Sequence, residues 1–138
     1  MNTIFILKTI GHVRSSLADR EHASKQGFEG APECWLEFKP EFREGLKDLR
    51  VGEEVLLITW LDRANRETLN VHPRDDLNAP LRGVFSTRSQ DRPNPVGIHR
   101  VKIVEMPSRT QFKVIDLEAF DATPIIDVKQ VLDRVNER

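Results

Sequence analysis

The apolar residues of this chain fall in short runs that glycine, proline or charged residues interrupt every few positions. Runs of this length that are rich in valine and isoleucine predict β-strands. We expect strands at residues 4–15, 34–38, 54–61, 69–72, 98–106, 112–118 and 125–129. The 54–61 run is almost continuously apolar, which predicts a strand buried on both sides. The absence of β-α-β alternation indicates a mainly β fold, a compact antiparallel barrel with one or two short helices.

Two segments have helical spacing. Pro40 precedes a stretch in which Phe42, Leu46 and Leu49 would share one face of a helix, and proline suits a first helical turn. Gly45 weakens this helix, so we expect it to be short. Residues 129–138 are charged with apolar residues at helical spacing, which suggests a frayed terminal helix.

The bulk composition points to one soluble domain spanning residues 1–138. Its formal net charge of -1 gives no general attraction to nucleic acid or membrane. The basic residues cluster locally, since residues 82–102 hold five of them and a single acid, Asp91. Cys34 has no cysteine partner, the N-terminus lacks a signal-peptide pattern, and no apolar run could span a bilayer, so we expect a cytoplasmic protein.

The segment from Gly83 to Arg100 combines apolar flanks with a polar middle. Prolines 93 and 95 restrict the backbone of this loop and of the residues that precede them. The loop would therefore be stiff before any ligand binds, and Arg88 and Arg92 offer forked donors suited to a carboxylate or phosphate. A rigid surface hairpin with solvated arginines is the alternative interpretation.

Other chemistries have weaker signals. The sequence has no Gly-rich dinucleotide or P-loop motif, and its four histidines lie on separate segments without metal-ligand spacing, so we expect no metal site. Most of these histidines are expected in loops or at the surface. Cys34 lies inside a predicted strand and is expected to serve packing. The acids between residues 116 and 127 could bind hydroxyl or ammonium groups, or could simply form a solvated turn.

Three motifs together resemble a known family. They are Ile10-Gly-His-Val-Arg-Ser, the stretch from Gly83 to Gly97 with its Thr-Arg-Ser and Arg-Pro-Asn-Pro elements, and Asp121-Ala-Thr-Pro-Ile-Ile-Asp-Val-Lys. They resemble the YaeB/TsaA-like, or TrmO-type, tRNA methyltransferases. The resemblance implies a β-barrel that binds S-adenosylmethionine, commonly at a homodimer interface, and methylates N6 of threonylcarbamoyladenosine beside the tRNA anticodon.

The resemblance also implies site residues. For the cofactor these are Lys25, Gln26, Gly27, Asp62, Arg63, Arg88, Ile98, Ile115, Asp116, Leu117 and Glu118. A second group would hold the substrate or shape the loop, namely Arg92, Asn94, Asp127 and Lys129. No general base is evident, so no catalytic residue is assigned.

The sequence departs from the family pattern in places that concern the substrate. Ala122 replaces the glycine of the usual Asp-Gly-Thr-Pro, and Gln130 and Val131 stand where Pro-Tyr is usual. Ser16 replaces the proline of the first motif, and Ser24-Lys25-Gln26 replaces Pro-Arg-Gln. A non-catalytic module that binds or senses S-adenosylmethionine is therefore the alternative function.

Overall fold

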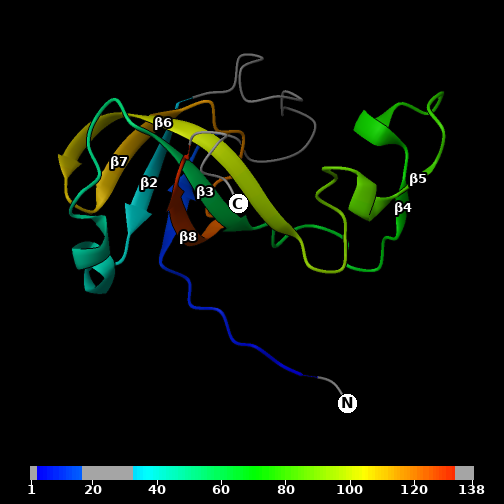
Figure 1. The fold of residues 1–138 in the computed structure, drawn as a ribbon, viewed down its shortest axis with the longest axis horizontal. Helices are drawn as coiled ribbons and strands as arrows, with labels where there is room; N and C mark the ends of the chain where they lie inside the picture. Colours follow the sequence, from blue (N-terminus) through cyan, green and yellow to red (C-terminus); the bar gives the residue numbers. More distant parts are fainter. Residues whose placement is uncertain (1–2, 17–32, 133–138) are drawn as a thin grey trace.

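Six strands form the body of the protein in the computed structural model, which describes residues 3–16 and 33–132 (Figure 1). They close into an antiparallel barrel in the order β1-β2-β7-β6-β3-β8. Their bounds are β1 Gly11–Arg14, β2 Cys34–Phe38, β3 Glu54–Trp60, β6 Val96–Ser108, β7 Gln111–Ile115 and β8 Pro124–Gln130. The predicted fold class, a mainly β antiparallel barrel, is confirmed.

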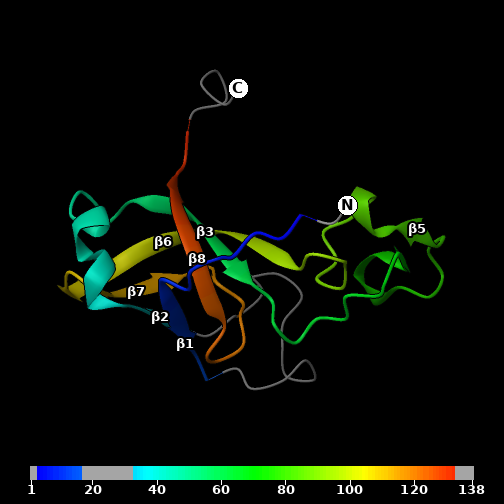
Figure 2. The same cartoon turned by 90° about the horizontal axis from the view of Figure 1, so that it is seen from below.

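Smaller elements flank the barrel. The 3-10 helix η2 (Pro40–Leu46) follows β2, and a lobe formed by the chain between β3 and β6 extends beside the barrel (Figure 2). The lobe contains the short pair β4 (Asn70–Val71) and β5 (Arg82–Gly83) with the 3-10 helices η3 (Pro73–Asp75) and η4 (Val84–Ser86). Over the described ranges, no helix has the length and apolar character needed to cross a membrane.

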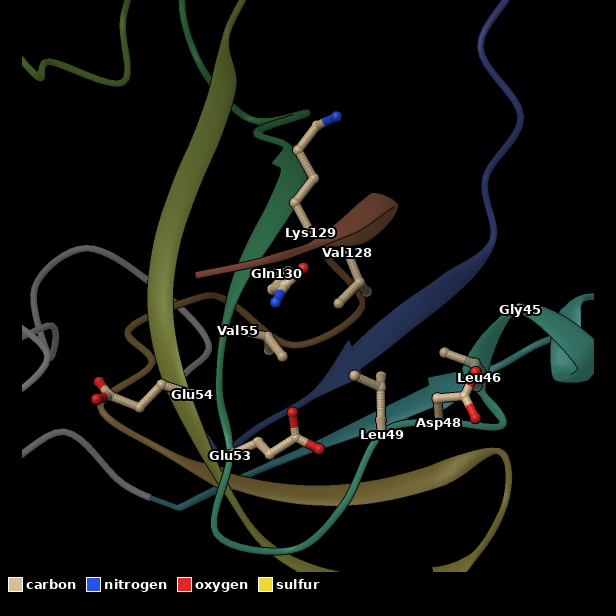
Figure 3. A pocket seen from close by; sticks show the side chains of 10 residues that line it. All are labelled: Gly45, Leu46, Asp48, Leu49, Glu53, Glu54, Val55, Val128, Lys129 and Gln130. Carbon is tan, nitrogen blue, oxygen red and sulfur yellow. The ribbon is translucent and has the colours of Figure 1, made fainter. Parts of the chain in front are cut away.

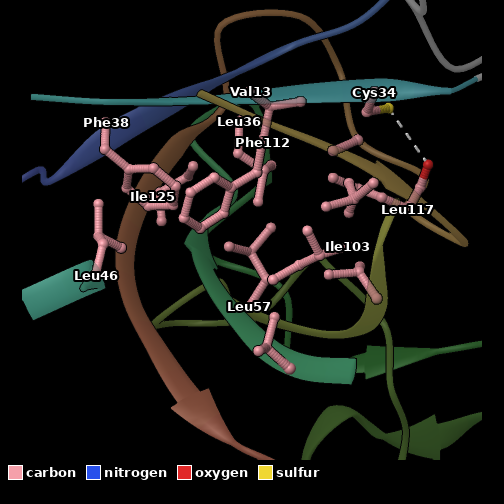
Figure 4. Packing of buried hydrophobic residues seen from close by; sticks show 14 residues of the cluster. Val13, Cys34, Leu36, Phe38, Leu46, Leu57, Ile103, Phe112, Leu117 and Ile125 are labelled. Carbon is pink, nitrogen blue, oxygen red and sulfur yellow. Dashed lines mark hydrogen bonds between the residues drawn. The ribbon is translucent and has the colours of Figure 1, made fainter. Parts of the chain in front are cut away.

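The core fills the barrel interior with inward residues from every strand (Figure 4). Phe112 lies in its centre, with its ring centroid 5.2 Å from that of Phe38. Cys34 is fully buried, and its thiol donates a hydrogen bond to the Leu117 carbonyl at 3.5 Å. Because Cys34 belongs to the buried core cluster, the prediction that it serves packing is confirmed. Burial also raises the pKa of this thiol.

Four details of the prediction are wrong. Residues 4–10 form no strand, and Ile4, Phe5 and Ile6 are at least 83% exposed. β3 is not buried on both sides, because Val55, Leu57 and Thr59 point inward while the alternate residues are half-buried. The helix after Pro40 is a 3-10 helix. Residues 129–130 belong to β8, while the rest of the expected terminal helix lies mostly outside the described residues.

The strand registers bring several connections to one end of the barrel, here called the loop end. Arg14 pairs with Trp35, Trp60 with Val96, and His12 with Pro124, so the neighbouring strand ends meet there. The connections that leave this end are residues 15–33, 61–95 and 116–123. The predicted cofactor residues in described loops, namely Asp62, Arg63, Arg88, Asp116, Leu117 and Glu118, therefore come from two connections that share one end of the barrel.

Candidate cofactor site at the loop end of the barrel

Arg92 organises the loop of residues 84–95, here called the motif loop because it carries the Thr-Arg-Ser and Arg-Pro-Asn-Pro elements. Its guanidinium donates to three backbone carbonyls, those of Ser89 at 2.7 Å, Val84 at 2.8 Å and Thr87 at 2.6 Å. Hydrogen bonds from a charged guanidinium are strong, and three of them to backbone carbonyls hold the backbone of the loop in one conformation. Because its donors are used within the loop, Arg92 holds the shape of residues 84–92.

A second set of contacts ties this loop to the start of the same connection. The Asn65 backbone N–H donates to the Asp91 carboxylate at 2.9 Å, and Arg66 Nε donates to the Pro93 carbonyl at 2.7 Å. Arg66 also donates to Asn94 Oδ1 at 3.2 Å and lies over the Trp60 ring at 5.1 Å. The two ends of the 61–95 connection therefore brace each other, and Asn94 belongs to that brace.

Arg88 differs from Arg92 because it is exposed. Its positive charge contributes to lowering the pKa of His99 of β6. An exposed guanidinium next to a braced loop is suited to bind a carboxylate that arrives from solvent.

His99 was not singled out by the sequence, which suggested that most histidines lie at the surface. It has the inward parity of Gly97 and Val101, and its Nε2 shares a hydrogen bond of 2.8 Å with the hydroxyl of buried Thr59. Burial, helped by the charge of Arg88, lowers the pKa of His99 to about 4. His99 is therefore neutral at pH 7. The only sequence signal for the inward position of His99 is the partial period of two in residues 98–106, which puts His99 and Ile98 on opposite faces of the strand.

The shift of His99 predicts acid sensitivity. In the unfolded chain the His99 imidazole binds a proton below about pH 6.5, whereas in the folded protein it does so only below about pH 4. Stability should thus be full above pH 6.5 and should fall as the pH drops toward 4, by about 3 kcal/mol from this group. Urea unfolding at pH 7 and pH 4.5 measures the loss. The His99→Gln variant, which cannot titrate, should lose less; an equal loss in both proteins would contradict the assignment.

The outer face of the sheet next to this end presents a mixed apolar and charged surface. Ile58 of β3 pairs with Ile98 on one side and with Asp127 on the other, so these three residues form one row across β6, β3 and β8. The next row contains Arg100, Leu56 and Lys129. Ile98 and Asp127 are thus two strands apart, or about 10 Å.

The turn between β7 and β8 closes the loop end from the other side. Asp121 Oδ1 accepts a hydrogen bond from the Ser15 backbone N–H at 3.0 Å, and the Ala122 N–H donates to the Val13 carbonyl at 2.7 Å. Arg63 lies over the Phe120 ring at 4.7 Å, which connects this turn with the 61–95 connection. The three connections at this end are therefore joined by contacts as well as by topology.

Ala122 adopts a backbone conformation that favours glycine, with φ at 69°. Because a Cβ is strained there, the Ala122→Gly variant should be more stable by about 0.5–1 kcal/mol after the entropy of the more flexible unfolded chain is counted. Chemical denaturation measures this change. A matched Ala119→Gly variant should be destabilised instead, and a loss of stability in Ala122→Gly would contradict the interpretation.

The predicted cofactor residues have different environments. Asp62, Arg63 and Arg88 are exposed, and Ile98 is 51% exposed on the outer face. Leu117 is fully buried, so its side chain belongs to the core and only its backbone could face a ligand. Ile115 and Glu118 are half-buried beside exposed Asp116, whose φ is 68°. Lys25, Gln26 and Gly27 lie outside the described residues.

Asp127 and Lys129 lie on β8, away from the motif loop in sequence. The Lys129 ammonium is 3.6 Å from Asp127 Oδ2, and the other carboxylate oxygen accepts the Val128 backbone N–H at 2.9 Å. Both side chains stand on the outer sheet face and share its rows with Ile98 and Arg100. The registers therefore place them beside the outward residues of β6.

The comparison with protein families decides the classification. Residues 12–137 match the family model described as the tRNA-methyltransferase O N-terminal domain. The chain belongs to this family. The match begins within β1 and runs past β8, so it includes the other five barrel strands in full and all three connections of the loop end.

Two similar proteins come from Archaeoglobus fulgidus. A probable S-adenosyl-L-methionine-binding protein is 40% identical over 89% of this chain and 33% of its own length. An S-adenosyl-L-methionine-binding protein is 36% identical over 96% of this chain and 95% of its own length. This chain thus spans about one third of the first relative and nearly all of the second.

A solved structure shares the fold. The crystal structure of TrmO from P. aeruginosa superimposes with a TM-score of 0.75 at 24% identity and covers 100% of this chain and 61% of its own. At that identity the likeness shows the fold alone.

Proposed function

We propose that this protein is an S-adenosylmethionine-dependent methyltransferase whose cofactor site is the loop end of the barrel. The observation that carries the proposal is the motif loop, in which Arg92 and Arg66 are used internally while Arg88 is left exposed. Membership of the family and the names of the two archaeal relatives support the same ligand.

The side chains at this end fit the ligand's chemistry. Arg88 would hold the amino-acid carboxylate, and exposed Val96 and Ile98 would contact the adenine. Asp116, Glu118 and the backbone carbonyls near them would accept hydrogen bonds from the ammonium group and the ribose hydroxyls. This division follows from charge and exposure.

The bound cofactor supplies an electrophilic methyl group on a sulfonium. When bound, it would give this methyl group to an acceptor nitrogen, which would lose a proton, while the sulfur would keep the electrons of the broken carbon–sulfur bond. The braced loop would contribute by orientation, which can lower a barrier by roughly 7–11 kcal/mol when the reactants are well aligned. No general base is assigned.

The acceptor we propose is N6 of threonylcarbamoyladenosine next to the anticodon of a tRNA, in the cytoplasm. The local excess of basic residues at 82–102 supports an anionic partner of this kind. Arg100 and Lys129 stand on the outer sheet face in the row of Leu56, one outward row farther from the loop end than Ile98, and Arg100 pairs there with Glu54 at 3.0 Å. We also propose that the protein acts as a homodimer.

A non-catalytic cofactor-binding module is the second candidate. Its support is the relative of nearly equal length, which is named only for binding S-adenosylmethionine, and Ala122 at a position whose backbone favours glycine. The same end of the barrel would then bind the cofactor without transfer.

Incubation with methyl-labelled S-adenosylmethionine and total tRNA, followed by mass analysis of the nucleosides, separates the two candidates. We expect label on the N6 methyl of threonylcarbamoyladenosine. Cofactor binding without labelling of any nucleoside would eliminate the tRNA methyltransferase and favour the binding module. Label on a different nucleoside would support methyl transfer to tRNA and contradict threonylcarbamoyladenosine as the acceptor.

A further inference from the structure

The barrel interior carries a pair of polar side chains near the loop end, the Thr59 hydroxyl and the His99 imidazole. Thr59 is fully buried, and its Oγ1 lies 2.8 Å from His99 Nε2. In the register of β3 and β6, His99 is opposite Leu57, whereas Thr59 is opposite Gly97, two residues nearer the loop end. The imidazole therefore extends from its own strand position toward the mouth of the barrel.

Gly97 leaves the space that this pair occupies. A Cβ at residue 97 would overlap the Thr59 hydroxyl and would lie 2.8 Å from His99 Nε2, closer than side-chain atoms approach one another. Any larger residue at this position would therefore push the two side chains apart. Three residues on two neighbouring strands are thus matched so that the imidazole is held in one orientation.

The hydrogen bond also determines which ring nitrogen carries the proton. The Thr59 hydroxyl is buried, and His99 Nε2 is the acceptor that the described residues offer it. A buried hydroxyl that does not donate costs the free energy of an unmade hydrogen bond. The hydroxyl therefore donates and Nε2 accepts. Because a pKa of about 4 keeps the ring neutral at pH 7, its single proton resides on Nδ1.

His99 Nδ1 is a donor without a partner in the described part of the chain. Every fully buried side-chain nitrogen or oxygen there has a hydrogen-bond partner, and the bond of His99 to Thr59 uses only Nε2. Nδ1 is therefore not sealed inside the core. β6 pairs with β3 from Val96 but with β7 only from Lys102 onward, so the stretch that includes His99 has a described partner strand on one side alone.

Apolar side chains separate His99 from the opposite end of the barrel. Val55 and Val101 are buried one inward position deeper than His99. The pocket of about 310 Å³ at that end is lined by Val55 together with Leu46 and Val128, and its described lining residues include no histidine (Figure 3). A ligand that contacts His99 therefore enters from the loop end, where the proposed cofactor site lies.

We infer that His99 is a further ligand-binding residue of the loop end and that Thr59 positions its ring. The Nδ1–H donates to an uncharged acceptor atom, either a ring nitrogen of the cofactor's adenine or a carbonyl oxygen of the methyl acceptor. Such a donor complements Arg88, whose charged fork suits a carboxylate. The inference rests on the proposed function, from which it takes the two candidate ligands.

Two-bond ¹H–¹⁵N NMR spectra of the histidine rings test the position of the proton in the ligand-free protein, and the His99→Leu variant identifies the His99 signals. We expect a protonated Nδ1 and an unprotonated Nε2. Thr59→Val removes the hydroxyl and should move the Nε2 resonance, whereas Thr59→Ser keeps the hydroxyl and should restore it. A proton on Nε2 in the parent protein, or an unchanged Nε2 resonance in Thr59→Val, would overturn the role of Thr59.

Two additions to the same sample identify the ligand atom. We expect saturating S-adenosylhomocysteine to move the Nδ1 resonance, which would assign the adenine. A shift that needs an anticodon stem–loop carrying threonylcarbamoyladenosine would assign the methyl acceptor instead. His99→Leu should weaken binding of the assigned ligand about 2- to 10-fold, whereas His12→Leu, on the outer face of β1, should leave it unchanged.

The failure of this inference differs from the failure of the proposed function. If calorimetry shows that S-adenosylhomocysteine is bound, and neither it nor the stem–loop moves the Nδ1 resonance, His99 is not a ligand-binding residue and the proposed function stands. If neither ligand binds to the folded protein, the proposed function is refuted and the inference falls with it.

Discussion

Replacing Arg92 with alanine is expected to destabilise the protein by about 2–4 kcal/mol and to abolish measurable cofactor binding. The guanidinium donates to the carbonyls of Ser89, Val84 and Thr87, so its removal leaves three partly buried acceptors without their charged donor. The loop would then lose the shape that presents Arg88. Urea unfolding and titration with S-adenosylhomocysteine measure the two effects.

Arg82→Ala is the matched control for this loss. Arg82 is an exposed arginine of the same connection, in β5, and its removal changes the net charge equally. We expect Arg82→Ala to change stability by less than about 0.5 kcal/mol. Comparable destabilisation by the two substitutions would mean that Arg92 acts through charge and that its three hydrogen bonds do not organise the loop.

Replacing Arg88 with alanine should weaken cofactor binding without lowering the stability of the protein. Because Arg88 is exposed, the variant should unfold at the same urea concentration as the parent protein. A charge-assisted hydrogen bond contributes about 1.5–3 kcal/mol, so cofactor binding should weaken by roughly 10- to 100-fold. Isothermal titration with S-adenosylhomocysteine measures the change.

Arg88→Lys distinguishes the forked donor from its charge. Lysine keeps the charge but cannot bind a carboxylate with two parallel hydrogen bonds, so binding should recover only in part. Full recovery would show that charge alone matters. Unchanged binding in Arg88→Ala would remove Arg88 from the site.

The strands were predictable where alternation and turn residues agree. β2 was predicted at its observed bounds, and the period of two in β6 correctly separated inward Val101 and Ile103 from outward Ile98 and Arg100. The arm at residues 4–7 has the same β-branched composition but lacks a neighbouring strand in its own barrel. Strand propensity describes a segment, whereas strand formation needs a partner edge.

The different roles of the three arginines in the 61–95 connection could not be predicted from the sequence. Arg66, Arg88 and Arg92 all follow polar residues in one connection, yet two of them bind carbonyls of that connection and one is exposed. Their roles depend on how the chain folds back between residues 61 and 95. The same applies to His99, whose hydrogen bond joins residues 40 positions apart.

The most direct test of this account is isothermal titration of the chain of residues 1–138 with S-adenosylmethionine and S-adenosylhomocysteine, with Arg88→Ala and Arg82→Ala measured alongside. We predict saturable binding to the parent protein and to Arg82→Ala, and much weaker binding to Arg88→Ala. No detectable binding to the folded parent protein, or equal binding to all three, would contradict the assignment of the loop end of the barrel as a cofactor site.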